Sequence, residues 1–236
     1  MQQDLSEGLA AVDFHAQESR SIGAQLHRVL RAAIIRGDLV PGQAISEIDM
    51  GRRFAISRQP VREAFIKLGE ERLLEVRPQR GTYVRKISVK EVLDARHLRE
   101  IIEVSIVREV TERRQPALIK ALRKIVTQQT AVKTGDSRGF LALDEELHRT
   151  LALNAGREYA WRVIESIKAQ MDRVRFLSYD FSLARSALVS EHAAIVDAIE
   201  SGHPDRADRE MTKHLRGILT TLPPIAERFP EYFVDG

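Results

Sequence analysis

The stretch that decides the fold runs from Ala55 to Leu68 and reads AISRQPVREAFIKL. Its apolar residues recur at the spacing of one helix face, and they are Val61, Ala64, Phe65 and Leu68. Arg58 and Arg62 lie one turn apart and share a different face. The stretch therefore predicts a helix that turns one face to a protein core and offers another to nucleic acid.

The start of this helix is also informative. Ser57 is a suitable N-cap, and because Pro60 has no N–H, the serine hydroxyl is expected to accept from Gln59. The other first-turn N–H groups would then face outward. An exposed helix N-terminus that carries two arginines is suited to contact phosphates and base edges.

The residues before this helix predict a helix-turn-helix. Residues 46–54 form a short helical pattern capped by Ser46, and only Ala55 and Ile56 separate it from Ser57. A longer helical pattern comes earlier and stops at Gly37, a residue suited to a left-handed C-cap.

The residues after it predict a β-hairpin, or wing. Residues 73–77 and 82–86 are prone to form strands, and the turn residues 78–81 place Arg80 at the tip. Residues 21–86 contain thirteen Lys and Arg against seven Asp and Glu, a net charge of +6, whereas the whole chain carries +3. A basic unit on an acidic remainder indicates binding to DNA, because neutralising phosphates supplies much of the affinity.

Three segments of this region resemble one family. They read IIRGDLVPG from Ile34, SRQPVREA from Ser57 and RPQRGTYV from Arg77, and together they are similar to the winged helix of GntR-family transcription regulators. The sequence differs at Met50-Gly51, where the family usually has Leu-Ala, and a glycine inside a helix costs about 1 kcal/mol relative to alanine.

The resemblance implies which residues contact DNA. Arg58 and Arg62 would contact guanines or nearby phosphates, and Ser57 and Gln59 would contact the backbone or base edges. Arg80 and Gly81, at the tip of the wing, would enter the minor groove.

Composition excludes several classes of protein. The chain has 236 residues and no cysteine, so disulfides, thiolate catalysis and Cys-type zinc sites are excluded. No apolar run approaches the roughly 18 residues needed to cross a bilayer, and the N-terminus lacks the apolar core of a signal peptide. The sequence thus predicts a cytoplasmic protein without a membrane partner.

The chain is long enough for two domains. We expect a mobile arm over residues 1–20, a winged helix-turn-helix over 21–87, and an all-α effector-binding and dimerisation domain over 88–236. The predicted helices of the last part are approximately 89–113, 116–133, 137–154, 157–180, 182–200 and 204–221. The fold class is therefore mainly α, with a helical bundle after the winged helix.

Three histidines and one aspartate lie on inward faces of the predicted bundle. Asp144 and His148 are at i and i+4 on one helix, while His192 and His214 each belong to an apolar stripe on a later helix. Four such residues could meet as a metal site. They could equally be hydrogen-bonded core residues, and the pattern by itself does not decide between the two interpretations.

A second resemblance bears on that choice. The segments REIIE from Arg99, FLALDEELH from Phe140, EH at Glu191 and MTKHL from Met211 are similar to the FCD effector-binding domain of the FadR-type branch of GntR regulators. In metal-binding members of that branch, the positions matching Asp144, His148, His192 and His214 hold a divalent ion. The resemblance thus implies a divalent metal cofactor, with zinc first and nickel or manganese as alternatives.

Arginines could hold an acidic effector near this ion. Arg99 is the candidate, because a guanidinium matches a carboxylate with two hydrogen bonds, although it could instead pair with Glu103 one turn later. Arg173 and Arg175 are weaker candidates, because alternate residues of a helix do not both face inward and at least one should be solvated.

The sequence therefore predicts a homodimeric, sequence-specific regulator of transcription, a repressor that binds an inverted-repeat operator in double-stranded DNA. A small organic acid bound near the metal would release it. One alternative keeps the DNA function but makes the metal structural or absent. A metal-dependent enzyme is disfavoured, because no nucleophile or general base accompanies the four proposed ligands.

Overall fold

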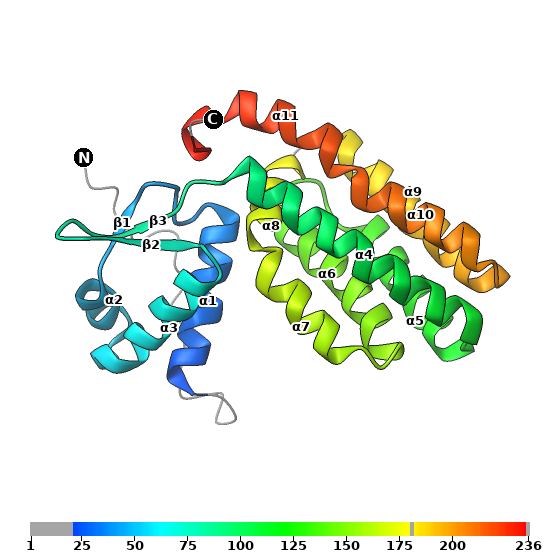
Figure 1. Ribbon diagram of the computed structural model, residues 1–236, viewed down its shortest axis with the longest axis horizontal. Coiled ribbons are helices and arrows are strands. Elements are labelled where there is room, and N and C mark those ends of the chain that lie inside the picture. Colours follow the sequence, from blue (N-terminus) through cyan, green and yellow to red (C-terminus); the bar gives the residue numbers. More distant parts are fainter. Residues whose placement is uncertain (1–20, 180–181, 235–236) are drawn as a thin grey trace. The chain divides into compact units, whose positions relative to one another are not determined.

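The computed structural model describes residues 21–179 and 182–234. The predicted N-terminal arm, residues 1–20, lies outside this range. The chain divides into two compact units (Figure 1). The described residues up to Val89 and from Phe229 onward form the first, and Lys90–Arg228 form the second. The fold is mainly helical with a small antiparallel sheet, as predicted. None of the described helices is long and apolar enough to cross a membrane.

The described part of the first unit contains three α-helices. Helix α1 (Ile22–Arg36) packs against α3 (Arg58–Glu70). Helix α2 (Glu47–Phe54) is joined to α3 by a short turn and also packs against it. The side chain of Ser46 caps α2, and Gly37 ends α1 with a φ of 75°, both as predicted. The core that joins these helices is apolar and fully buried, with Leu26, Leu30, Val61, Ala64 and Leu68 at its centre.

A three-stranded antiparallel sheet completes this unit. Strand β3 (Gly81–Val84) lies between β1 (Ala44–Ile45) and β2 (Leu74–Arg77). The β2–β3 hairpin is the predicted wing, and Gly81 has a φ of 102° at its tip. Strand β1 was not predicted, because two residues are too few to show a periodicity; its Ala44 pairs with Tyr83 of β3.

The C-terminal segment also belongs to the first unit, although the sequence-based division placed it in the helical domain. After a short 3-10 helix (Pro230–Tyr232), Phe233 forms an isolated parallel bridge with Ile87. The N–H of Ile87 donates to the Tyr232 carbonyl at 2.8 Å, and the N–H of Val234 donates to the Ile87 carbonyl at 3.0 Å. These backbone hydrogen bonds leave no pattern in the sequence.

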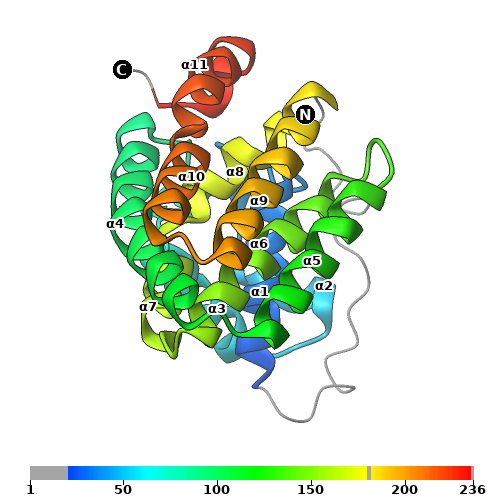
Figure 2. The ribbon, with the colours of Figure 1, turned by 90° about the vertical axis from the view of Figure 1, so that its right-hand side faces the viewer.

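The second unit is a bundle of helices. Figures 1 and 2 show them as α4 (Val89–Arg113), α5 (Pro116–Ala131), α6 (Ser137–Asn154), α7 (Glu158–Ile167), α8 (Ala169–Ser178), α9 (Ser182–Ser201), α10 (Pro204–Arg216) and α11 (Ile218–Arg228). Helix α9 packs against both α5 and α10, and α5 packs against α6. Their shared core is apolar and includes Leu122, Leu147, Trp161, Ile195, Ile199 and Met211.

Two segments that were each predicted to be one helix form two consecutive helices in the structure. The predicted helix 157–180 changes direction at Lys168, where no glycine or proline marks the sequence. The Lys168 side chain is buried and pairs with Asp172 at 2.5 Å and Glu145 at 3.3 Å. The predicted helix 204–221 ends at Gly217, and α11 then continues through Pro223 and Pro224 to Arg228.

Candidate functional sites

The predicted DNA-contacting residues lie on the surface of the first unit. Ser57, Arg58, Gln59 and Arg62 are exposed on the N-terminal half of α3, and Arg80 and Gly81 are exposed at the tip of the wing. In Figure 1 the N-terminal end of α3 and the tip of the wing face the same side of this unit.

The expected cap of α3 was wrong. Ser57 has the backbone conformation of an N-cap, but its hydroxyl makes no capping hydrogen bond. Because the first-turn N–H groups of Arg58 and Gln59 lie on an exposed surface, they remain accessible to a phosphate.

One contact holds Arg58 in place. Its Nε lies 2.7 Å from Oε2 of Glu47 on α2, and the arginine side chain is 73% exposed. Exposed ion pairs contribute about 0–1 kcal/mol, so a DNA phosphate can replace this carboxylate at little cost. Gln59 donates to Glu63 at 3.2 Å, on the same exposed face.

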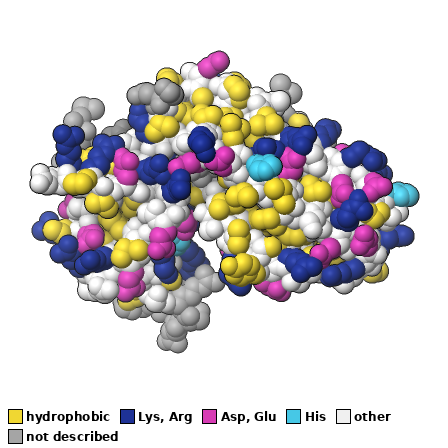
Figure 3. Space-filling model, in the orientation of Figure 1, with side chains coloured by type: hydrophobic (Ala, Val, Ile, Leu, Met, Phe, Trp, Pro, Cys, Tyr) yellow, Lys and Arg dark blue, Asp and Glu magenta, His cyan; other side chains and the backbone are white. Residues whose placement is uncertain are grey.

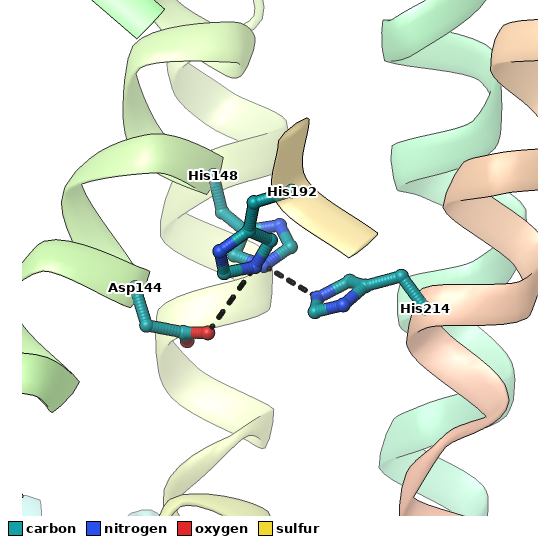
Figure 4. Close-up of side chains that lie close together, drawn as sticks. All are labelled: Asp144, His148, His192 and His214. Carbon is teal, nitrogen blue, oxygen red and sulfur yellow. Dashed lines mark hydrogen bonds and ion pairs between the residues drawn. The ribbon is translucent and has the colours of Figure 1, made fainter. Parts of the chain in front are cut away.

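The four predicted metal ligands come together inside the bundle (Figure 4). Helix α6 supplies Asp144 and His148, α9 supplies His192, and α10 supplies His214. All four are buried, and one potential ligand atom from each lies within 4.8 Å of the others. Nε2 of His148 is 3.2 Å from Nε2 of His214, and Nε2 of His192 is 3.5 Å from Oδ1 of Asp144.

The outer nitrogen of each histidine has an acceptor. Nδ1 of His192 lies 2.8 Å from Oε1 of Gln129, and Nδ1 of His214 lies 3.1 Å from Oε2 of Glu191. Nδ1 of His148 contacts Oε2 of Glu103. The acceptors of His192 and His214 hold the ring hydrogen on Nδ1, which leaves the Nε2 lone pairs of these two rings free to bind a cation.

This arrangement fits a divalent cation. Oδ1 of Asp144 and Nε2 of His192 are buried and have no hydrogen-bond partner among the described residues. A carboxylate and neutral imidazoles are ligands that zinc and similar ions prefer. The cluster can therefore hold a metal ion, whose charge would satisfy these atoms.

The surroundings of the cluster keep its side chains in the protonation states that bind a cation. Burial would raise the pKa of Asp144, but the Arg175 guanidinium beside it acts against burial, and that pKa lies well below its usual range. Burial and the neighbouring positive groups lower the pKa values of His192 and His214 well below the ordinary value. The aspartate is thus ionised and both imidazoles are neutral at neutral pH.

Arg175 was misjudged from the sequence. Both Arg173 and Arg175 are buried, so the expectation that at least one would be solvated was wrong. Helix α8 packs against α6, α7 and α11 and is buried around its circumference. Nη1 of Arg175 donates to Oδ2 of Asp144 at 2.7 Å, and Nη2 lies 3.4 Å from Nε2 of His214.

Arg99 pairs with Glu103, as one of the two interpretations proposed. Its Nε lies 2.5 Å from Oε1 of Glu103, and the arginine side chain is 1% exposed. Burial opposes ionisation of Glu103, yet Arg99 and His148 hold its pKa well below the usual range. The Nη1 of Arg99 is buried and has no hydrogen-bond partner among the described residues.

A pocket of about 350 Å³ opens beside the cluster, between α8, α9, α10 and α11. Its wall contains Arg175, Glu191 and His214. The rest of the wall is mostly apolar or hydroxyl-bearing and includes Met171, Tyr179, Leu215, Ile218 and Thr221. A small ligand in this pocket would reach Arg175 and His214.

The outer acceptors of the histidines were missed by sequence reasoning. Glu191 adjoins His192 in the chain, but it serves His214, on another helix. Gln129 carries no charge and belongs to no motif, so no signal pointed to it. Glu103 was considered only as a partner of Arg99.

A winged helix-turn-helix joined to a helical bundle with an interior aspartate–histidine cluster defines a class of protein, the DNA-binding regulators of transcription. The chain belongs to the GntR family: residues 23–84 match the family described as bacterial regulatory proteins, gntR family, and residues 94–217 match the FCD domain. Members of this family are regulators and not enzymes, which confirms the prediction.

Curated relatives agree with this assignment. The chain is 34% identical over 225 residues to the HTH-type transcriptional repressor RspR of Escherichia coli, and the match covers 95% of this chain and 99% of that protein. It is 28% identical over 202 residues to the probable D-xylose utilization operon transcriptional repressor of Paenarthrobacter nicotinovorans, covering 84% and 88% of the two chains.

A solved structure shows the same fold. The chain is similar to McbR/YncC of Escherichia coli, with a TM-score of 0.75 and 16% identity over 89% of this chain and 99% of that one. At this identity the likeness concerns the fold alone.

Proposed function

We propose that this protein is a homodimeric repressor that binds an inverted-repeat operator and is released by a small carboxylate bound beside a divalent metal ion. The observation that supports the sensory part is that three buried imidazoles and one carboxylate each bring a potential ligand atom within 4.8 Å of the others, while the outer nitrogens of His192 and His214 have hydrogen-bond acceptors. Ligand atoms arranged in this way can bind a cation, and a bound cation attracts an anionic ligand.

The DNA-binding part of the proposal assigns roles to single residues. Arg58 and Arg62 on α3 would read base edges in the major groove, with Ser57 and Gln59 on the backbone. Arg80 and Gly81 would enter the minor groove from the wing. All six are exposed, and the Arg58–Glu47 pair is weak enough to exchange for a phosphate.

A second copy of the chain would cover the exposed face of α4. Leu93, Leu98 and Ile101 are 36%, 45% and 58% exposed and lie on the side of α4 opposite its buried residues. Figure 3 shows hydrophobic side chains gathered over the first half of this helix. An apolar face of this kind supports an interface, and a single helix-turn-helix needs a symmetric partner to read an inverted repeat.

Asp144, His148, His192 and His214 would hold the ion, which we propose to be zinc, or else nickel or manganese. The ion would supply open coordination positions to an effector carboxylate. Arg175 lines the adjoining pocket and would contact that carboxylate from the side. Arg99 would provide a further donor through its unpaired Nη1.

The chain connects this pocket to the DNA-binding unit through its C-terminal end. Ile218, Thr220 and Thr221 of α11 line the pocket, and α11 continues into the segment that is hydrogen-bonded to Ile87. Ile87 follows the wing and precedes α4. A ligand that shifts α11 would therefore act on both chain connections of the first unit, and it would lower operator affinity only if it binds one arrangement better than the other.

Deletion of residues 229–236 tests this route. The truncated protein should still bind its operator, while the effector should change operator affinity much less than in the full chain. Retention of the full effector response would show that the signal travels through the Val89–Lys90 connection alone.

The second interpretation makes the metal purely structural. It predicts that removing the metal lowers thermal stability. It also predicts that no small acid releases the DNA, because no effector binds beside the metal. We favour the sensory role because a pocket with a buried arginine opens onto the cluster.

Operator binding in the presence of metal and candidate acids tests the proposed function. A fluorescent DNA fragment from the region upstream of the coding sequence would be titrated with metal-loaded and chelator-treated protein, with and without small organic acids. The proposal predicts release by an acid only in the metal-loaded protein. Release that is equal after chelation would contradict it.

A further inference from the structure

A second cavity, of about 380 Å³, lies on another side of α9 in the helical unit. We call it the Gln129 pocket, and it lies between α5, the start of α6 and α9. Its wall combines hydroxyl-bearing and apolar side chains: Thr130, Thr134, Ser186, Ser190, Val132, Phe140 and Val189. Tyr179 lies in the wall of this cavity and of the pocket beside α11, but none of the residues proposed above to contact DNA, the metal ion or the effector carboxylate lines it. The proposed function therefore leaves this cavity unused.

Two buried polar groups in the wall have no partner. The Tyr179 side chain is 1% exposed and its hydroxyl has no hydrogen-bond partner among the described residues. Gln129 is 2% exposed, and its Nε2 is also unpaired while its Oε1 is bound to His192. An unpaired buried polar group costs about 1–3 kcal/mol. Two such groups on residues that line one cavity therefore point to a ligand that pairs with both.

A buried positive charge lies beside these two groups. Arg185 is 9% exposed, and both its terminal nitrogens donate to the Lys133 carbonyl at 3.2 Å. Its guanidinium lies over the ring of Phe140, 5.0 Å from the centroid. No carboxylate pairs with Arg185 among the described residues, so its charge is not neutralised.

The groups of the wall select the chemistry of the ligand. Gln129 Nε2, the Tyr179 hydroxyl and Arg185 are donors, which suit a carboxylate. The serine and threonine hydroxyls suit ligand hydroxyl groups. The volume lies within the roughly 300–1,000 Å³ of small-molecule sites.

We propose that the Gln129 pocket binds a small hydroxylated carboxylate of the sugar-acid type, with the carboxylate against Arg185, Gln129 and Tyr179. This site is separate from the metal cluster, but one side chain touches both. A ligand that accepts a hydrogen bond from Nε2 of Gln129 fixes the orientation of the whole side-chain amide. The Oε1 of the same amide is the hydrogen-bond partner of His192 Nδ1. Occupancy of the pocket and the orientation of His192 are therefore coupled.

Isothermal titration calorimetry of the full chain with D-gluconate tests the proposal. The titration is made after exhaustive chelation and again with zinc, because binding here requires no metal, whereas binding at the cluster does. We expect gluconate to bind the chelated protein. Arg185→Gln should weaken this binding at least tenfold, and the matched variant Thr221→Val, in the pocket beside α11, should leave it unchanged.

Tyr179→Phe provides a second variant that keeps the shape of the wall. It should weaken gluconate binding several-fold without lowering the melting temperature, because the hydroxyl that it removes is unpaired in the free protein. Absence of gluconate binding to chelated protein would overturn the proposal. So would binding that is insensitive to Arg185→Gln and Tyr179→Phe, or lost in Thr221→Val. Loss of metal-dependent DNA release with gluconate binding retained would instead refute only the proposed function.

Discussion

Nη1 of Arg175 donates to Oδ2 of Asp144 across 2.7 Å, which joins α8 to α6 inside the bundle. The other oxygen of this carboxylate, Oδ1, has no hydrogen-bond partner among the described residues and lies 3.5 Å from Nε2 of His192. One side of the carboxylate is thus held by a fixed cation, and the other side is open to a metal ion.

Replacing Arg175 with Gln should affect the metal-free protein most. Removing one partner of a buried pair costs about 3–5 kcal/mol, because the remaining charge is left uncompensated. A bound divalent ion would compensate Asp144 in its place. We therefore expect a large loss of unfolding free energy in chelated protein and a smaller loss with zinc, measured by urea unfolding. An equal loss in both states would show that the ion does not contact this carboxylate.

Replacing His192 with Ala should abolish stoichiometric metal binding, as measured by elemental analysis of dialysed protein. Glu191→Gln, which weakens the acceptor for Nδ1 of His214, should lower metal affinity by about 10–100-fold. His203→Ala is the matched control, since His203 is exposed at the start of α10 and should have no effect. Metal content that is unchanged in His192→Ala would exclude the proposed site.

Replacing Arg62 or Arg58 with Ala should cost about 1–3 kcal/mol of discrimination between operator and unrelated DNA. Both side chains lie on the exposed face of α3, where they would contact base edges. Lys124→Ala, at an exposed position of the helical unit, serves as the control and should behave as the unaltered protein. An unaltered sequence preference in both arginine variants, measured by competition with scrambled DNA, would refute their assignment.

The winged-helix unit should lose stability in acid through Glu71. This carboxylate pairs with His27 at 2.6 Å and Arg31 at 2.7 Å. Burial raises its pKa, but these two partners outweigh burial, and the pKa lies below its ordinary value of 4.5. Because the folded-state pKa is depressed, the stabilisation is complete above 4.5 and is lost as the pH falls through the folded value.

Glu71→Gln should therefore lower the unfolding free energy by about 1–3 kcal/mol at neutral pH, and the difference from the unaltered protein should shrink in acid. Urea unfolding across a pH series measures this difference. Glu70→Gln, an exposed neighbour, is the control and should change little at any pH. A difference that stays constant into acid would show that the Glu71 carboxylate is not the group responsible.

The sequence predicted those parts of the structure that rest on local spacing. The apolar stripe from Val61 to Leu68 and the turn at Gly81 lie in the predicted elements, because helical period and positive φ leave clear patterns. The four cluster residues were candidates because each lies on an inward stripe of a predicted helix, and the resemblance to the FCD domain then favoured a metal site over hydrogen-bonded core residues.

Features set by tertiary packing were not predictable in this way. The bend at Lys168 carries no glycine or proline, since a buried lysine and its partners stabilise it. At least one of Arg173 and Arg175 was expected to be solvated because helical period assumes one solvent face, whereas both are buried on α8. Gln129 reaches His192 from a different helix, and no sequence pattern reports a contact between residues so far apart.

The central claim is that this chain is a sequence-specific regulator of transcription, and fluorescence anisotropy with DNA from its own upstream region tests it most directly. The measurement would be made across a salt series, with scrambled DNA of the same length as competitor. We predict tight binding that prefers the upstream sequence, with the logarithm of the binding constant falling linearly and steeply with the logarithm of salt concentration. Weak binding with no preference over the scrambled DNA, in metal-loaded and chelated protein alike, would contradict the account.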